Sequence, residues 1–232
     1  MWRPSQISGS RDHMFYTGVA LIFACSVFVG FSRTYYLKAF FGTPHLSGIA
    51  HLHGAAFTAW TLFFVCQTGL ILAGRTDGHR RVGTAGAVFG IGIVLLGAVM
   101  TFHSVRAGYA SGRPHMAELL INAIIDLLLF CGFFATGWIL RHKKEIHKRC
   151  MMLAMVSLII PAIARLPIPF GMIAWVICAF SLTGVAYDLI VLRRVHLTSI
   201  AGALLINVAT PLRFIIADTR AWQNLAEWIM KS

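Results

Sequence analysis

Residues 113–130 read Arg-Pro-His-Met-Ala-Glu-Leu-Leu-Ile-Asn-Ala-Ile-Ile-Asp-Leu-Leu-Leu-Phe, an apolar run interrupted by regularly spaced polar residues. A helix would place His115, Glu118, Asn122 and Asp126 on one face, because they recur at intervals of three or four. In contact with lipid, an Asp near the centre of such a helix would cost about 2.5 to 3.5 kcal/mol. The polar face therefore turns toward protein, water or metal, and it marks a candidate functional site.

The composition indicates an integral membrane protein. Of 232 residues, 58% are hydrophobic and 12% charged, and the mean hydropathy is +0.75. A soluble protein of this length could not bury so much apolar surface in one core. A hydrocarbon layer of about 30 Å needs about 20 apolar residues to cross it. Seven runs meet this requirement, at approximately 14–34, 52–74, 82–104, 116–140, 149–166, 170–192 and 197–216.

We therefore predict an all-α integral membrane bundle of seven transmembrane helices in residues 1–216. Residues 217–232 carry Trp222, Leu225 and Trp228 near one face, which predicts an amphipathic interfacial helix on the outer surface. Basic residues concentrate in alternate loops, so the positive-inside rule predicts that the amino terminus lies inside and the carboxyl terminus outside.

The partner that these features predict is the lipid bilayer. The net charge of +12 does not indicate nucleic acid, because the basic residues lie in loops and are not interleaved with aromatic residues. A homo-oligomer is left open, and no soluble partner is predicted. The five cysteines show no C-x-x-C spacing and are interpreted as small buried hydrophobic residues.

Ten histidines are many for so apolar a chain. If consecutive helices cross the membrane in opposite directions, several of these histidines lie near the outer membrane surface, together with Glu118. Imidazole and carboxylate groups in a helical bundle suit zinc, copper or iron. The predicted metal ligands are His51, His53, His103, His115 and Glu118. Residues two apart on a helix point to nearly opposite sides, so only one of His51 and His53 is expected to face the bundle.

Haem b is the alternative cofactor, since imidazole is its usual axial ligand. Arg165 and Arg213, both expected at the outer level, would then bind the haem propionates. The third span carries Gly83, Gly86, Gly90 and Gly97 on one face, where either a flat cofactor or a neighbouring helix could approach. Close packing between helices is the favoured interpretation of that face.

The inner level has its own histidines, which are His79, His142, His147 and His196. A second site at His79 and His147 is left open, but their basic neighbours favour a solvated loop. Near the same level, Asp188 is expected to form a local ion pair with Arg193 and Arg194.

Glu118 and Asp126 are the candidate catalytic residues. An ion pair with Arg213 or Arg165 would explain each carboxylate equally well. Asp126 is expected near mid-membrane, where a proton relay or support of a metal ligand competes with a simple hydrogen bond to a neighbouring helix.

The leading functional prediction is a membrane protein that binds a transition metal or haem and serves redox chemistry or metal handling; if it is an enzyme, a membrane oxidoreductase is favoured. One alternative is a zinc-dependent hydrolase of lipids, with zinc on His53, His103 and His115 and water activated by Glu118 or Asp126. Another is a proton-coupled transporter or channel that uses the polar face of residues 115–126.

Four motifs carry a resemblance to a known group. They are His51-Leu-His53-Gly54, His79-Arg-Arg-Val-Gly83, His147-Lys-Arg-Cys-Met-Met and Pro211-Leu-Arg213. With them the chain resembles a family of uncharacterised bacterial multi-spanning membrane proteins, and it is more distantly similar to small histidine-rich membrane families of unknown function. The resemblance implies the bacterial inner (plasma) membrane as the location and implies no particular cofactor.

Overall fold

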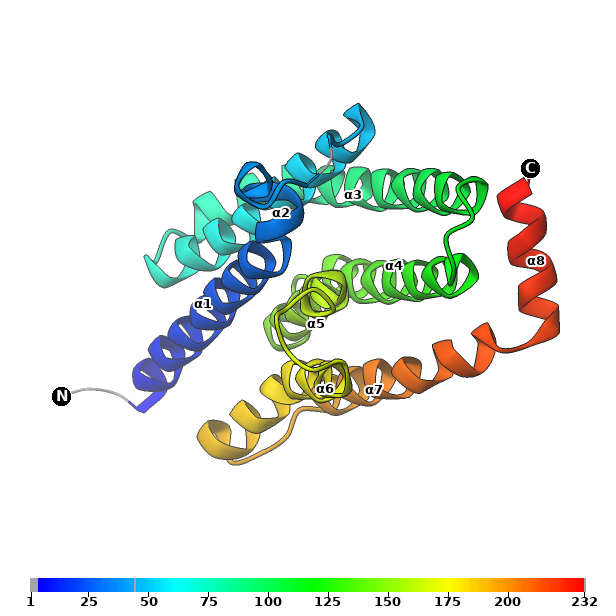
Figure 1. The fold of residues 1–232 in the computed structure, drawn as a ribbon. Coiled ribbons are helices and arrows are strands. Elements are labelled where there is room, and N and C mark those ends of the chain that lie inside the picture. Colours follow the sequence, from blue (N-terminus) through cyan, green and yellow to red (C-terminus); the bar gives the residue numbers. More distant parts are fainter. Residues whose placement is uncertain (1–3, 44, 232) are drawn as a thin grey trace. The chain divides into compact units, whose positions relative to one another are not determined.

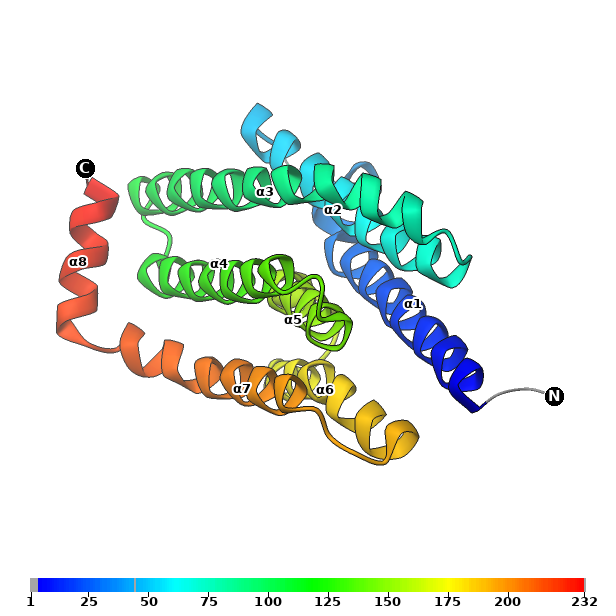
Figure 2. The same ribbon diagram turned by 180° about the vertical axis from the view of Figure 1, so that it is seen from behind.

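The computed structural model describes residues 4–43 and 45–231, and these residues form helices with no β-strand (Figures 1 and 2). Seven of the helices are long and apolar enough to cross a membrane, which confirms the predicted all-α multi-pass fold. The α-helices are α1 Pro4–Phe31, α2 Gly48–Leu72, α3 Thr76–Ala110, α4 Met116–Ile139, α5 Lys144–Ile163, α6 Phe170–Tyr187, α7 Leu197–Ala217 and α8 Arg220–Lys231. The orientation with the amino terminus inside stays a prediction.

Shorter helical segments extend two of the spans. A π-helical turn, η1 at Ser32–Tyr36, continues α1, and a 3₁₀ turn, η2 at Lys38–Phe41, follows it. A second π-helical turn, η3 at Asp188–Leu192, continues α6. Left-handed backbone ends several helices: Gly74 follows α2 with φ 72°, and Gly112 follows α3 with φ 69°. Glycine suits both places because it has no Cβ to clash.

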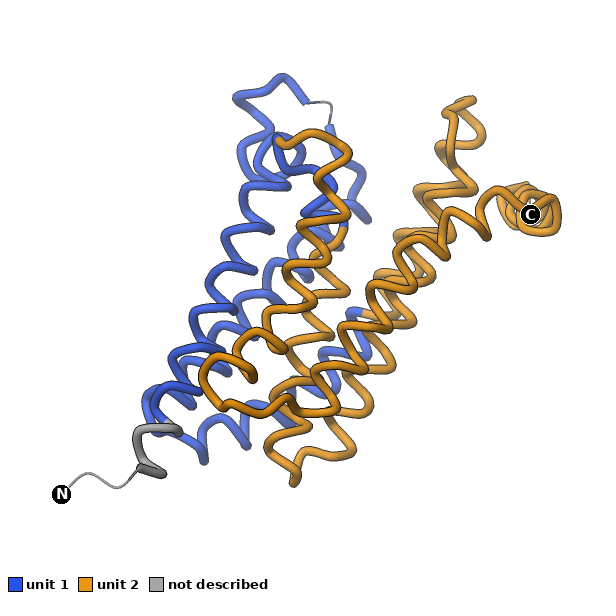
Figure 3. Tube along the Cα trace, turned by 90° about the horizontal axis from the view of Figure 1, so that it is seen from below, with its two compact units in different colours: residues 1–93, 161–167 blue, residues 94–160, 168–232 orange. Residues whose placement is uncertain are grey.

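The chain divides into two compact units (Figure 3). Unit 1 comprises residues 1–93 and 161–167, which include α1, α2 and the first half of α3. Within it the Thr17 hydroxyl of α1 donates to the Thr68 carbonyl of α2 at 3.2 Å. Gly86 of α3 lies so close to the Phe63 ring of α2 that a side chain at this position would overlap it. The structure therefore supports close helix packing at this part of the glycine face.

Unit 2 comprises residues 94–160 and 168–232, which include the rest of α3 and most of α4 to α8. Small residues allow its helices to approach one another. A Cβ on Gly184 of α6 would meet the Met152 side chain of α5, and one on Gly202 of α7 would meet Leu153. These contacts bring the polar residues of α5, η3 and α7 within reach of each other.

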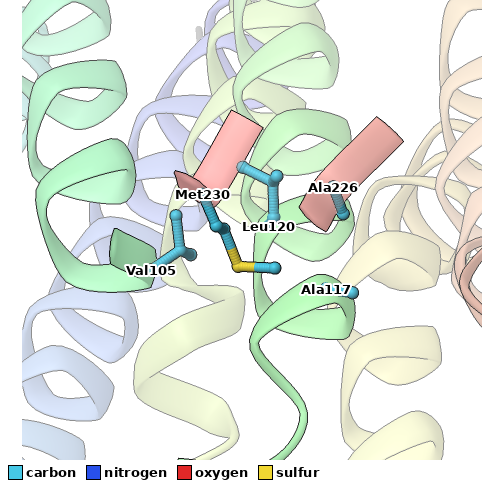
Figure 4. Packing of buried hydrophobic residues seen from close by; sticks show 5 residues of the cluster. All are labelled: Val105, Ala117, Leu120, Ala226 and Met230. Carbon is cyan, nitrogen blue, oxygen red and sulfur yellow. The ribbon is translucent and has the colours of Figure 1, made fainter. Parts of the chain in front are cut away.

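Helix α8 packs against the end of α3 and the start of α4 within unit 2. Val105, Ala117, Leu120, Ala226 and Met230 form one buried cluster, in which Met230 reaches between Val105 and Leu120 (Figure 4). The Trp222 indole N–H donates to the Ala117 carbonyl at 3.0 Å. Leu225 and Trp228 remain 47% and 67% exposed. Trp222 thus lies on the packed face, apart from Leu225 and Trp228, and this grouping differs from the one predicted.

Candidate functional sites

The polar face of α4 begins with an exposed pair. His115 Nδ1 lies 2.8 Å from Glu118 Oε1, and the two side chains are 71% and 40% exposed. His115 adopts left-handed backbone, with φ 63°, directly before the first residue of α4. A protonated imidazole can donate to the carboxylate, and a metal ion could replace that proton between them. One turn further along, Asn122 is half-buried.

Asp126 forms a buried ion pair with Arg213 of α7. Asp126 Oδ1 and Arg213 Nη2 are 3.0 Å apart, and the two side chains are only 9% and 5% exposed. Neither of these two atoms has a well-aligned hydrogen bond in the described residues. Arg213 Nε makes a long bond of 3.4 Å to the Ala209 carbonyl. The ion pair predicted as one explanation of Asp126 is therefore present.

In unit 1 the two histidines of the first motif differ. His51 is exposed, whereas the ring of His53 packs against Phe57 with centroids 4.1 Å apart. His53 Nδ1 is buried and has no hydrogen-bond partner among the described residues. Because a buried polar atom without a partner is costly, this nitrogen has bonding capacity that a ligand or an ordered water would fill. Of the two histidines, His53 is the one that turns inward.

Arg165 supplies the positive charge near His53. It follows the end of α5, and its charge acts on the His53 imidazole. Its guanidinium lies 4.9 Å from the centre of the Phe31 ring and donates to the Pro161 carbonyl at 2.7 Å. Burial lowers the pKa of Arg165 below its ordinary value, but arginine starts so high that it keeps its charge at neutral pH.

Two further histidines share an arrangement that sequence analysis did not identify. His79 Nδ1 lies 3.3 Å from the Gln67 carbonyl, and His147 Nδ1 lies 2.9 Å from the Gly137 carbonyl. Each histidine is the fourth residue of its helix, and its ring contacts a backbone carbonyl of the preceding helix. A sequence repeat could have indicated this arrangement. Residues 77–81 and 145–149 both read acidic residue, any residue, His, basic residue, Arg. Both rings are half-buried, in contrast to the solvated loop expected, while His142 is exposed.

The most extensive polar network joins α5, η3 and α7. Arg149 Nη2 and Nε donate to the two carboxylate oxygens of Asp188, the second at 3.2 Å. Ser199 Oγ donates to Asp188 at 2.7 Å, and the His196 backbone N–H donates at 3.1 Å. The expected local pairing of Asp188 with Arg193 and Arg194 is wrong, because Arg149 is buried and requires a counter-ion.

The predicted metal ligands are divided between the units. His51 and His53 belong to unit 1, while His103, exposed on α3, belongs to unit 2 with His115 and Glu118. Within residues 4–43 and 45–231, no group of three or more His, Cys, Asp or Glu side chains is placed to hold a metal ion. The five-residue ligand set and the zinc site on His53, His103 and His115 stay predictions. So does propionate binding by Arg165 and Arg213.

Comparisons with known proteins gave no match to a family model, to a curated protein or to a solved structure. The resemblance to bacterial multi-spanning proteins therefore stays a prediction, and the geometry of the described residues carries the functional proposal.

Proposed function

We propose that this multi-pass membrane protein binds haem b at His53 and Arg165 and serves redox chemistry, with the bacterial inner membrane as its location. The observation that carries the proposal is the buried ring nitrogen of His53, which has no hydrogen-bond partner among the described residues. The positive charge of Arg165 acts on the same imidazole. Imidazole is the common axial ligand of haem iron. The guanidinium would neutralise a propionate, for which its fork of N–H donors is well suited.

Arg165 favours haem over a bare metal ion at this site. A divalent cation on His53 would be repelled by the positive charge of the guanidinium. Haem carries its own negative charges, so the same arginine attracts it. Phe57 against the His53 ring and Phe31 against Arg165 supply apolar neighbours for a porphyrin.

An absorption spectrum of protein purified in detergent, without added metal or chelator, tests the proposal. We expect a Soret band that sharpens on reduction with dithionite, and about one haem per chain by extraction. His53→Ala should abolish or strongly reduce haem content. His51→Ala is the matched control, because it removes the same residue type two positions away from an exposed site. Added imidazole should restore binding to His53→Gly.

Arg165 is tested separately. Arg165→Gln should weaken haem retention more than Arg165→Lys, since lysine keeps the charge while losing the fork. A colourless protein, or equal haem loss in the His51 and His53 variants, would contradict the assignment.

A second candidate is a transition-metal site at His115 and Glu118. It rests on the 2.8 Å separation of a ring nitrogen and a carboxylate oxygen on an accessible surface. Further ligands would have to join these two, because one histidine and one carboxylate do not complete a zinc, copper or iron site. Elemental analysis distinguishes the candidates: stoichiometric zinc or copper without a Soret band, lowered by His115→Ala and Glu118→Gln, would favour this site. The lipid hydrolase would additionally require esterase activity that depends on the metal.

A further inference from the structure

Asp126 lies deep within α4, whereas its partner Arg213 lies about one turn from Ala217, the last residue of α7. Asp126 is ten residues from Met116, the first residue of α4, which corresponds to about 15 Å at the rise of an α-helix. That distance is half of a hydrocarbon layer of about 30 Å. Ionisable residues at such depth are costly, and in membrane proteins they mark proton and ion pathways.

The two buried ion pairs of unit 2 differ in how completely they are hydrogen-bonded. Asp188 accepts from two nitrogens of Arg149, from Ser199 and from the His196 backbone. Within residues 4–43 and 45–231, Asp126 pairs with Arg213, and the facing atoms, 3.0 Å apart, are poorly aligned for a hydrogen bond. The donors around Asp188 hold it in the ionised form. The environment of Asp126 leaves its carboxylate able to accept a proton.

Two polar residues of α4, which we call the polar track, precede Asp126 on the way to the first turn of the helix. Asn122 and Glu118 precede Asp126 by four and eight residues, so they lie on the same face of α4, one turn of about 5.4 Å apart. Asn122 is half-buried, and Glu118, paired with His115, is 40% exposed. Gaps of one turn suit single bridging waters, and an amide can both accept and donate hydrogen bonds.

Helices α7 and α8 pack against α4 within unit 2. Helix α7 contributes Arg213, the charged group that acts on Asp126. Helix α8 covers the start of α4 with Trp222, Ala226 and Met230, while its Glu227 bonds to Lys231 and to Tyr109 of α3. A proton that enters at Glu118 therefore meets Asp126 as the next carboxylate along α4.

We propose that Asp126 is a proton-binding site loaded through Glu118 and Asn122 from the first turn of α4. Loading transfers one proton from water to a carboxylate oxygen of Asp126, with no change of oxidation state. The pair then passes from net neutral to net positive, and Arg213 loses its counter-ion. This coupling of a proton to a buried charge is the elementary step of proton-coupled transport, and it does not depend on haem.

Infrared difference spectroscopy on protein with ¹³C-labelled aspartate tests the site in proteoliposomes. On acidification we expect the carbonyl stretch of a protonated, buried carboxyl group, shifted by the label and absent in Asp126→Asn. Asp218→Asn, a change at an exposed residue after α7, is the matched control and should keep the band. A wild-type spectrum without this band at every pH at which the helices persist would show a permanently ionised pair and overturn the proposal.

The route is tested by a pH jump applied to one side of the vesicles. Glu118→Gln and Asn122→Leu should each slow the appearance of the Asp126 band by at least several-fold without removing it. Unchanged rates in both variants would overturn the route. The double variant Asp126→Asn/Arg213→Gln guards against misfolding, because it removes both charges together. It should keep wild-type helicity and show no band, whereas a band in this variant would overturn the assignment to Asp126.

Discussion

Arg149 of α5 contacts both carboxylate oxygens of Asp188 in η3, with both side chains only 1% exposed. The arginine also donates to the Glu145 carboxylate at 2.6 Å and to the Ser199 hydroxyl at 3.0 Å. One buried guanidinium thus joins α5, η3 and α7. Its hydrogen bonds account for the charge without any ligand, which identifies this network as structural.

Removing one member of this network should destabilise the protein strongly. Asp188→Asn leaves the buried Arg149 charge without its main counter-ion, and such a loss costs about 3–5 kcal/mol. Unfolding in detergent, followed by circular dichroism, would measure the change in free energy. Asp218→Asn serves as the exposed control and should shift stability by less than about 0.5 kcal/mol. Equal stability of the two variants would contradict a structural role for the network.

Acid should weaken the start of α7 through His196. Its Nδ1 accepts from the Thr198 N–H at 3.2 Å, which requires the unprotonated nitrogen. Burial, followed by the positive charge of Arg149, lowers the pKa of His196 below its ordinary value of 6.5. The unfolded chain therefore binds this proton at higher pH than the folded protein does.

The sign of the effect follows from that difference. The contribution of His196 to stability is fully present above about pH 6.5 and is lost as the pH falls toward the lower, folded pKa. Unfolding free energies measured between pH 7.5 and about pH 5 should fall for the wild-type protein. His196→Asn keeps a capping side chain but does not titrate, so it should flatten this dependence. An identical slope in the variant would show that other groups cause it.

The two faces of α8 predict different environments for its tryptophans. Trp222 packs on α4, while Trp228 is 67% exposed and faces away from the cluster of Val105, Leu120 and Met230. If α8 lies in the membrane interface, brominated lipids should quench Trp228 fluorescence more than Trp222 fluorescence. The measurement uses variants in which the other tryptophans are replaced by phenylalanine. Equal, weak quenching of both would place α8 in water and contradict the interfacial prediction.

The existence of seven spans could be predicted from sequence, because hydropathy over about 20 residues depends on composition alone. The ends were less accurate, since α3 extends six residues beyond the predicted run 82–104 at each end. An ion pair of Asp126 with Arg213 or Arg165 was also predicted as one explanation, since a charge at that depth requires a partner; the structure identifies Arg213 as that partner. His53 could not be distinguished from His51 in advance. Two histidines two residues apart point to nearly opposite sides of a helix, and the sequence does not show which side the neighbouring helices cover.

Arg149 shows where prediction from sequence failed. It follows the basic run 141–148 and resembles one more solvated loop residue, yet its side chain is 1% exposed. Its partner Asp188 lies 39 positions away, and no local spacing relates the two. The nearer Arg193 and Arg194 offered a simpler pairing, but both side chains are exposed. Tertiary packing thus determined a contact that local charge patterns misassigned.

Two glycines of α3 provide a direct test of helix packing in unit 1. Gly86 lies against the Phe63 ring of α2, and a Cβ there would overlap the ring, whereas a Cβ on Gly92 would meet no atom within 4 Å. Gly86→Val should therefore destabilise the protein by about 1–3 kcal/mol through overpacking. Gly92→Val, the same change on the same helix, should have a much smaller effect.

Thermal unfolding of both valine variants in one detergent makes the comparison, because the change in helix propensity is common to the two. Replacing Phe63 by alanine in the Gly86→Val background should recover part of the loss, since it opens space for the new side chain. If Gly86→Val and Gly92→Val unfold at the same temperature, the close approach of α2 and α3 at Phe63 does not contribute to stability.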